Sequence, residues 1–553
     1  MGRRFWLSLA MLAAGATLLL AAGFASPAGS GENPSFGAHA KRGGMLRLST
    51  FSDVDFVDPA LAYIPHSWSL EFATCAKLFN YPDKAKAAGT RVIPEVVRTW
   101  RVSKDRRTYT FELKKTFRFH TGAPVTARSF ADAFDRDANP RMPSPAKAYM
   151  HEIVGADAVI EGRAKTISGV RVLGRYRLRI GLTKPLGGFT ARLTMPFFCP
   201  LLPNAPIESD GIDDPPGSGP YYVAERVVNQ RVVLKRNRFY RGGRPANADQ
   251  VVWTIGMSVE GCRLATEQDR IDYCVLTPLP GTNTYRELAA RYGINRKGGQ
   301  LFFDTTLNTQ FFAFNHERKA FKGRGQIPLK KAINYAIDRP ALARTFGYLG
   351  GRRTDQLLPR ALGRDESIYP IKGADPAAAR KWLARARFKP SRLVLYAWNR
   401  GWGFAAAEVF KFDLQQIGID VDVKYFDPGQ ISERVGIRGE PFDVVQGGWA
   451  TDYADAEAYF EPLLNGRNLG STGNTNTSYF DEPRINARIA AANRLTGEAR
   501  RKAWANLDVD LMRNDPPWAP FVHWATRDFV SPSFGCYVFH PEYWLDIAAA
   551  CKK

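Results

Sequence analysis

Aromatic and carboxylate side chains follow directly after a short apolar run at residues 442–445. The length and β-branched content of that run predict a buried strand. Gly447 and Gly448 are expected to end it. Two aromatic residues and two carboxylates come next: Trp449, Tyr453, Asp452 and Asp455. Ligands of α/β sheets bind beyond the carboxyl ends of the strands, so this stretch is a candidate binding site.

A βαβ unit is predicted just upstream. Residues 393–398 read as a strand, 405–417 as a helix that stops at Gly418, and 419–426 as a second strand. The first of these strands also ends in candidate binding residues: Trp398, Asn399, Arg400 and Trp402. Two strand ends would then bring one set of ligand-binding residues into a common crevice: Asp452, Trp449, Tyr453, Trp398, Arg400 and Trp402. In the alternative interpretation the aromatic residues belong to the edge of the core and Asp455 caps a helix beginning near Ala456.

Length and composition bound the class of protein. A chain of 553 residues is too long for one core and predicts two to four domains. The 45% hydrophobic and 12% aromatic fractions are typical of a packed globular protein. The net charge of +23 is spread along the chain, without a basic run or a nucleic-acid-binding motif. It would suit an anionic lipid or cell-wall polymer, and a compositional bias of the source proteome explains it as well.

The amino terminus has the layout of a secretory signal. Arg3 and Arg4 precede an apolar stretch at residues 5–25, which predicts a signal peptide at 1–28 and an exported protein. The stretch is almost long enough to span a bilayer, so an uncleaved anchor is the alternative. Residues 29–42 would form a tether.

Six cysteines in an exported chain predict disulfides, and none of them forms a CxxC pair or a zinc-like cluster. Cys262 with Cys274 and Cys536 with Cys551 bracket short segments and are the first two predicted pairs. This leaves Cys75 with Cys199 as the third. Buried free thiols are the alternative, because sequence alone does not fix connectivity.

Several motifs, taken together and in order, resemble the family 5 extracellular solute-binding proteins, the peptide- and nickel-type receptors of ABC importers. They are the block 94–137, GSGPY at 217–221, LKRNRFYRGGRPANADQVVW at 234–253, FFAFN ending at Asn315, PLKKAINYAIDRPAL at 328–342, and GWATDYAD at 448–455. They cover nearly all of the chain that follows the predicted signal.

The resemblance implies an α/β, two-lobed periplasmic-binding-protein fold (class II, type C cluster) with mixed sheets, flanking helices and a ligand cleft between the lobes. The implied boundaries are 43–300 for lobe I, with a smaller subdomain at about 80–200, then 301–516 for lobe II, and 517–553 for the return to lobe I. The chain would cross between lobes near 301–314 and near 517–529. Lobe closure on a solute would precede docking on a membrane permease.

The resemblance also implies a role for Asp452, at the position where peptide-binding relatives hold the α-ammonium group of the ligand. Trp449 and Tyr453 would line the pocket, with Trp398 and Trp402 on the neighbouring strand end. Two features depart from the family pattern. Phe404 and Ala405 stand where dipeptide-specific relatives carry an arginine, with Arg400 the nearest one, and no cysteine precedes Cys75 as a site for lipid attachment.

We therefore predict a periplasmic or cell-surface receptor that captures an oligopeptide. It would act as a monomer with ABC permease subunits, without cofactor, metal or nucleic acid. An oligosaccharide or nickel complex as ligand, and a sensing or adhesion receptor, are the alternatives. An exported hydrolase is the rival class, and the chain contains no GxSxG, HExxH or SxxK constellation with supporting context.

Overall fold

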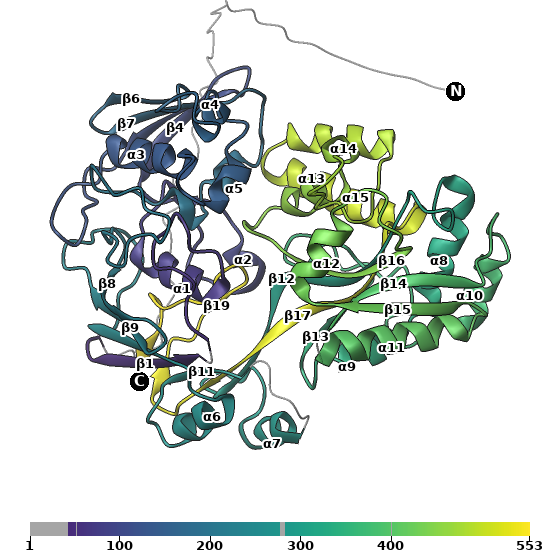
Figure 1. The fold of residues 1–553 in the computed structure, drawn as a ribbon. Coiled ribbons are helices and arrows are strands. Elements are labelled where there is room, and N and C mark those ends of the chain that lie inside the picture. The colour runs from purple at the N-terminus through teal and green to yellow at the C-terminus, as the bar shows by residue number, and fades with distance from the viewer. Residues whose placement is uncertain (1–41, 51, 277–282, 400) are drawn as a thin grey trace, which may run out of the picture. The chain divides into compact units, whose positions relative to one another are not determined.

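The computed structural model describes residues 42–50, 52–276, 283–399 and 401–553 (Figure 1). The predicted signal peptide lies outside the described residues, as do nearly all of the tether and the candidate residue Arg400. Within the described ranges, no helix has the length and apolar character needed to cross a membrane.

An 11-stranded mixed sheet runs through the described chain. Its order is β15 (Asp420–Phe426), β14 (Arg392–Trp398), β16 (Val444–Ala450), β12 (Leu301–Phe314), β17 (Trp518–Val530), β11 (Tyr273–Val275), β1 (Met45–Thr50), β10 (Gln250–Ile255), β9 (Arg231–Arg236) and β8 (Tyr221–Val227), with β13 (Gly351–Arg353) paired to β17. Strand β14 is parallel to both β15 and β16, and β1 is parallel to both β10 and β11. The other pairs are antiparallel.

Strands β12 and β17, at the two places where we expect the chain to cross, are the longest and pair with each other. Alternate residues of β12 face opposite sides of the sheet. Phe312 and Phe314 pack in one core cluster, and Phe311 and Ala313 in another. The lobe boundaries drawn from the sequence remain a prediction.

Helices cover both faces of the part of the sheet that contains β14, β16, β12 and β17. The first cluster contains residues of α8 (Ile327–Ala336), α9 (Arg339–Arg344), α10 (Pro376–Leu383) and α11 (Gly401–Gln415). The second contains residues of α12 (Pro428–Val435), α13 (Glu457–Leu464), α14 (Pro483–Asn493) and α15 (Gly497–Asn514). The βαβ unit predicted from the sequence is therefore present as β14, α11 and β15, although α11 begins four residues before the expected position.

The first part of the chain carries a separate four-stranded sheet, in the order β4 (Val97–Val102), β5 (Thr108–Leu113), β7 (Arg177–Gly181) and β6 (Val170–Gly174). The inward residues of β5 and β7 pack with α1 (Pro65–Thr74), α3 (Ala127–Ala138), α4 (Ala156–Ile160), α5 (Phe189–Arg192) and the 3-10 helices η1 (Pro145–Tyr149) and η2 (Pro196–Phe198). Thr126 and Ser129 form a capping box at the start of α3. Helices α6 (Val259–Glu267) and α7 (Asn283–Tyr292) pack against β11 and β12.

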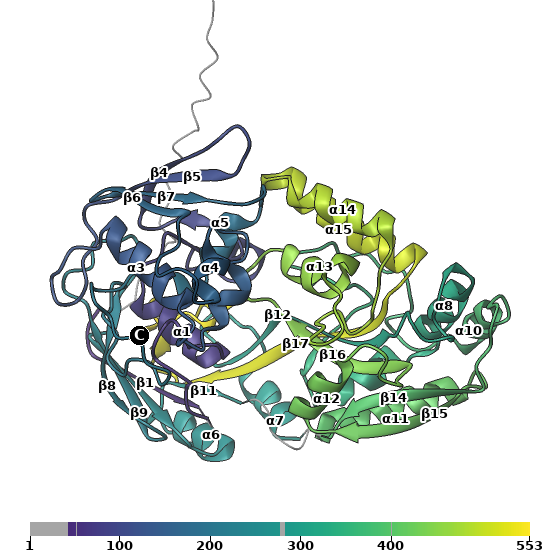
Figure 2. The same ribbon diagram turned by 45° about the horizontal axis from the view of Figure 1, so that its top comes forward.

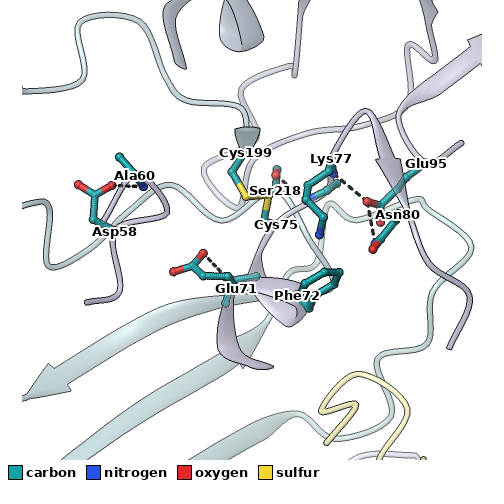
Figure 3. Close-up of a disulfide and its surroundings, with 12 residues drawn as sticks. Asp58, Ala60, Glu71, Phe72, Cys75, Lys77, Asn80, Glu95, Cys199 and Ser218 are labelled. Carbon is teal, nitrogen blue, oxygen red and sulfur yellow. Dashed lines mark hydrogen bonds between the residues drawn. A yellow bond between two sulfur atoms is a disulfide. The ribbon is translucent and has the colours of Figure 1, made fainter. Parts of the chain in front are cut away.

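The three predicted disulfides are all formed, and they account for all six cysteines. Cys75 follows the end of α1 and bonds to Cys199 beyond η2, so this bond joins the two ends of the segment that carries the four-stranded sheet (Figure 3). Beside it, Ala76 donates its backbone N–H to Ser218 Oγ at 2.9 Å.

The expected end of β16 at Gly447 and Gly448 is wrong, because the strand continues through both glycines to Ala450. The reason lies on β12, whose Phe311 and Gln310 pair with these two positions. A Cβ atom on Gly447 would lie 2.7 Å from the Phe311 ring, and one on Gly448 would lie 2.4 Å from the Gln310 amide. The glycines make room for neighbouring side chains and do not break the strand.

Gly447→Ala is accordingly expected to destabilise the protein by about 1–3 kcal/mol. The Phe311 ring cannot move aside easily, because it stacks on Trp518 with 3.8 Å between ring centroids. Thermal unfolding followed by circular dichroism measures the effect. Gly429→Ala in the first turn of α12, where an added Cβ meets nothing within 4 Å, is the matched control. Equal melting temperatures for the two variants would contradict the packing explanation.

Candidate functional site

Asp452 lies two residues beyond the end of β16 and is partly buried. The backbone N–H of Thr451 donates to Leu307 O of β12, at 3.1 Å, and fixes the start of the turn. Tyr149, the last residue of η1, donates its hydroxyl to Asp452 Oδ2 at 2.6 Å. The Tyr63 hydroxyl, in the loop before α1, lies 3.4 Å from that of Tyr149. Parts of the chain more than 300 residues apart, at 149 and 452, thus meet at this carboxylate.

The negative charge of Asp452 has no positively charged partner among the described residues. Burial raises the pKa of its carboxyl group, and hydrogen bonds from Tyr149 and Tyr63 lower it in part. Among the described residues, no lysine, arginine or histidine nitrogen lies within 4.0 Å of this carboxylate. A partly buried carboxylate whose neighbours are neutral hydroxyls gains from a cationic partner. An ammonium or guanidinium group is the chemical match for such a carboxylate.

A second buried acid, Glu542, lies close to this turn. Thr451 Oγ1 donates to Glu542 Oε2 at 2.9 Å. Burial raises the pKa of the Glu542 carboxyl group, and the nearby charge of Asp452 raises it further. Glu542 Oε1 has no hydrogen-bond partner within the described ranges. Glu542 stands between β19 (Phe539–His540) and β20 (Trp544–Leu545), about 90 residues beyond Asp452 in the chain. No local pattern in the sequence indicated Glu542, Tyr149 or Tyr63.

The two aromatic candidates beside Asp452 have structural contacts of their own. The Trp449 indole N–H donates to Ala458 O at 2.8 Å, and its ring is half-buried against the core. Tyr453 is only 3% exposed and packs in the core of the four-stranded-sheet region. Its ring meets Tyr149 edge-on, with 6.2 Å between centroids. Tyr453 thus helps to position Tyr149.

Trp398 and Trp402 pack against each other, with 4.7 Å between ring centroids. Trp402 lies in the first turn of α11, not after the strand end, and also meets Phe346 at 4.5 Å. Both rings are half-buried on the core clusters of the β14 region. No hydrogen bond or ring contact in the described part of the chain links them to Asp452. The structure therefore brings Trp449, Asp452 and Tyr453 together along one turn, and places the two other indoles in a pair of their own.

Asp455 takes part in a buried network of ion pairs instead of facing a ligand. Its carboxylate accepts the N–H of Glu457, the first residue of α13, at 2.9 Å and forms two bonds of 2.8 Å to Arg500 of α15; the N-cap position is Ala456, one residue later than the capping interpretation expected. Glu457, itself fully buried, pairs with Arg500 at 2.9 Å and with Arg192 of α5 at 2.6 Å. The network therefore fixes the turn that presents Asp452 and joins it to both α5 and α15.

Comparison with known proteins gives the family. The family described as "Bacterial extracellular solute-binding proteins, family 5 Middle" matches residues 91–471. The chain belongs to this family. Its members are solute-binding proteins of ABC importers, so this is an exported protein of a family whose role is binding.

Relatives and solved structures agree with that assignment. The periplasmic oligopeptide-binding protein OppA of Escherichia coli is 24% identical over 469 residues, covering 80% of this chain and 81% of its own. The heme-binding protein A of Haemophilus influenzae is 24% identical over 500 residues, with 85% and 86% covered. A solved structure, the clavulanic acid biosynthesis oligopeptide binding protein 2, matches with a TM-score of 0.82, 24% identity, and 93% and 96% coverage. The fold is thus the two-lobed α/β fold of periplasmic binding proteins.

Proposed function

We propose that this family 5 protein binds short peptides through their free amino terminus, with Asp452 as the partner of the α-ammonium group. The observation that carries the proposal is the Asp452 carboxylate, which accepts the Tyr149 hydroxyl and which no described cation neutralises. Relatives whose names state a peptide ligand, such as OppA, support the peptide class.

Binding would also join two parts of the protein. Tyr149 and Tyr63 come from the first third of the chain and Asp452 from the last. A ligand held among them contacts both and so stabilises the closed arrangement by its differential affinity. The closed protein, as a monomer in the periplasm or on the outer face of the membrane, would then deliver the peptide to an ABC permease.

The proposal predicts that Asp452→Asn weakens binding of a free tripeptide by about 100-fold, since breaking a buried charge pair costs 2–5 kcal/mol. Acetylating the peptide amino terminus is expected to weaken binding to the unmodified protein by a similar factor. Isothermal titration calorimetry with a free and an acetylated peptide measures both effects. Asp422→Asn, on an exposed position of β15, is the matched control.

The two changes remove the same interaction, so their effects are not additive. Acetylation should therefore cost little more once Asp452 is replaced. If Asp452→Asn binds free peptides as tightly as Asp422→Asn does, Asp452 is not the ammonium site. If an oligosaccharide, a nickel complex or heme binds and peptides do not, the peptide class is wrong and the family assignment stands.

A further inference from the structure

A second concave region lies between the first part of the chain and the helices α13 to α15. It is a cavity of about 870 Å³, lined on one side by Ala87, residues 90–92, Trp100, and residues 187, 188, 190 and 191 at the start of α5. On the other side lie the loop 360–364, the turn 454–456 and the first turns of α15. Figure 2 shows α14 and α15 beside the four-stranded sheet and α5, and Gly187 donates its N–H to Asn493 O at 2.7 Å at this junction.

This cavity is separate from the candidate peptide site. Tyr63, Tyr149 and Asp452 do not line it, although Asp455 does. Arg500 also lines it, and pairs with Asp455 and Glu457. The ion-pair network thus belongs to the wall of this cavity as well as to the turn that presents Asp452.

Basic residues outnumber acidic residues on the cavity wall. Six basic residues line it: Arg91, Arg360, Arg364, Arg500, Arg501 and Lys502. Four of the six are in ion pairs: Arg500 with Asp455 and Arg501 with Glu498, which also line the cavity, and Arg360 with Asp365 and Arg364 with Glu366. Arg91 and Lys502 have no ion-pair partner within 4.0 Å among the described residues. An excess of one sign of charge on a concave surface concentrates ions of the opposite sign.

The start of α15 adds to the positive potential. Gly497 and Glu498, its first two residues, line the cavity. The preceding residue, Thr496, makes no side-chain hydrogen bond to the helix, so the first N–H groups of this 18-residue helix lack a side-chain cap. Free N–H groups and the helix dipole both favour an anion at such a position.

We propose that this cavity binds a small polyanion, a solute with two or more phosphate or carboxylate groups. Several separated cations around a space of this volume match a ligand with several anionic groups better than a single small ion. Because the wall is built from both the early and the late parts of the chain, the polyanion contacts both. The bound polyanion therefore favours the arrangement in which the early and late parts of the chain lie against each other. A ligand that bridges the same two parts at Asp452 favours that arrangement too, so by linkage each ligand raises the affinity for the other.

The test uses the whole exported chain and two probes, inorganic pyrophosphate and citrate, with isothermal titration calorimetry at low salt. We expect at least one probe to bind, with an affinity that falls as salt rises. The double variant Arg364→Gln with Lys502→Gln is expected to bind at least about tenfold more weakly. Both side chains are exposed, so the fold is preserved, and an unchanged melting temperature without ligand verifies this.

The matched control removes two positive charges elsewhere, by Arg231→Gln with Lys235→Gln on β9. Binding of pyrophosphate alone assigns phosphate groups as the ligand chemistry, and binding of citrate alone assigns carboxylates. Equal losses in the two double variants would show a general charge effect and overturn the cavity site. The site is also overturned if neither probe binds the unmodified protein, a result that would leave the peptide proposal untouched because Asp452 is tested with different ligands.

Discussion

Replacing Cys75 and Cys199 together by serine is expected to lower the free energy of unfolding by about 4–5 kcal/mol, the largest stability effect that we expect from a pair of substitutions. The disulfide spans 124 residues, and a cross-link that closes a long loop restricts the unfolded chain most. It also ties the ends of the segment that carries the four-stranded sheet, next to the end of α1 (Figure 3).

The surroundings of this bond add to the expected loss. Cys75 and Cys199 are 3% and 2% exposed, so two serine hydroxyls would be buried in their place. Nearby, Lys77 is fully buried with its Nζ 3.7 Å from the centroid of the Phe72 ring. Its backbone N–H donates to Glu95 Oε2 at 2.7 Å, and burial lowers the pKa of its amine to about 7. We therefore expect greater freedom of the chain beside Lys77 to disturb these contacts and to lower stability further.

Guanidinium chloride unfolding, followed by tryptophan fluorescence, measures the change. The matched control is the double variant Cys536→Ser with Cys551→Ser, whose disulfide spans 15 residues. The expected loss for this shorter loop is about 3 kcal/mol. A larger loss for the shorter loop would show that native contacts, and not restriction of the unfolded chain, dominate the effect.

Arg500→Met is expected to destabilise the protein by about 3–5 kcal/mol, because it leaves buried carboxylates without their cation. The Arg500 side chain is 4% exposed, and Glu457 is fully buried. Arg500 supplies both bonds of 2.8 Å to Asp455 and one of 2.9 Å to Glu457. After the substitution Arg192 alone faces Glu457, and Asp455 keeps only its backbone contact.

The neighbouring Arg501 provides the control within the same helix. Its side chain is 64% exposed and pairs with Glu498, so Arg501→Met is expected to change stability by at most about 0.5 kcal/mol. Adding Asp455→Asn and Glu457→Gln to Arg500→Met removes the unpaired charges and should recover part of the loss. Chemical unfolding of the unmodified protein, the Arg500→Met and Arg501→Met variants and the triple variant measures these differences in stability. Equal stability of the Arg500→Met and Arg501→Met variants would refute the role given to the network.

Peptide binding would depend on the same network if Asp452 is the ligand site. Asp455 and Glu457 fix the turn directly after Asp452. A variant that loses Arg500 is therefore expected to bind more weakly as well as to unfold earlier, whereas Asp452→Asn should affect binding alone.

The features that the sequence by itself determined are local or carried by family motifs. The βαβ unit and the three disulfides follow from short patterns or from pairs of cysteines. The family assignment came from motifs spread along the chain, and the match over residues 91–471 confirms it. Asp452 was selected in the same way; its carboxylate accepts the Tyr149 hydroxyl and has no cationic partner among the described residues.

Only the tertiary structure decided what surrounds that carboxylate. The pair Gly447 and Gly448 predicts the end of a strand, but both residues lie within β16. Side chains of β12 occupy the space that a Cβ atom would need at these two positions, which explains why both are glycine. Tyr149 reaches Asp452 across 303 positions, and Glu542 approaches it through Thr451 from a hairpin near the end of the chain. Periodicity and turn chemistry report on neighbours within a few residues. Contacts between residues hundreds of positions apart depend on how sheets and helices pack, and so they became visible only in the folded chain.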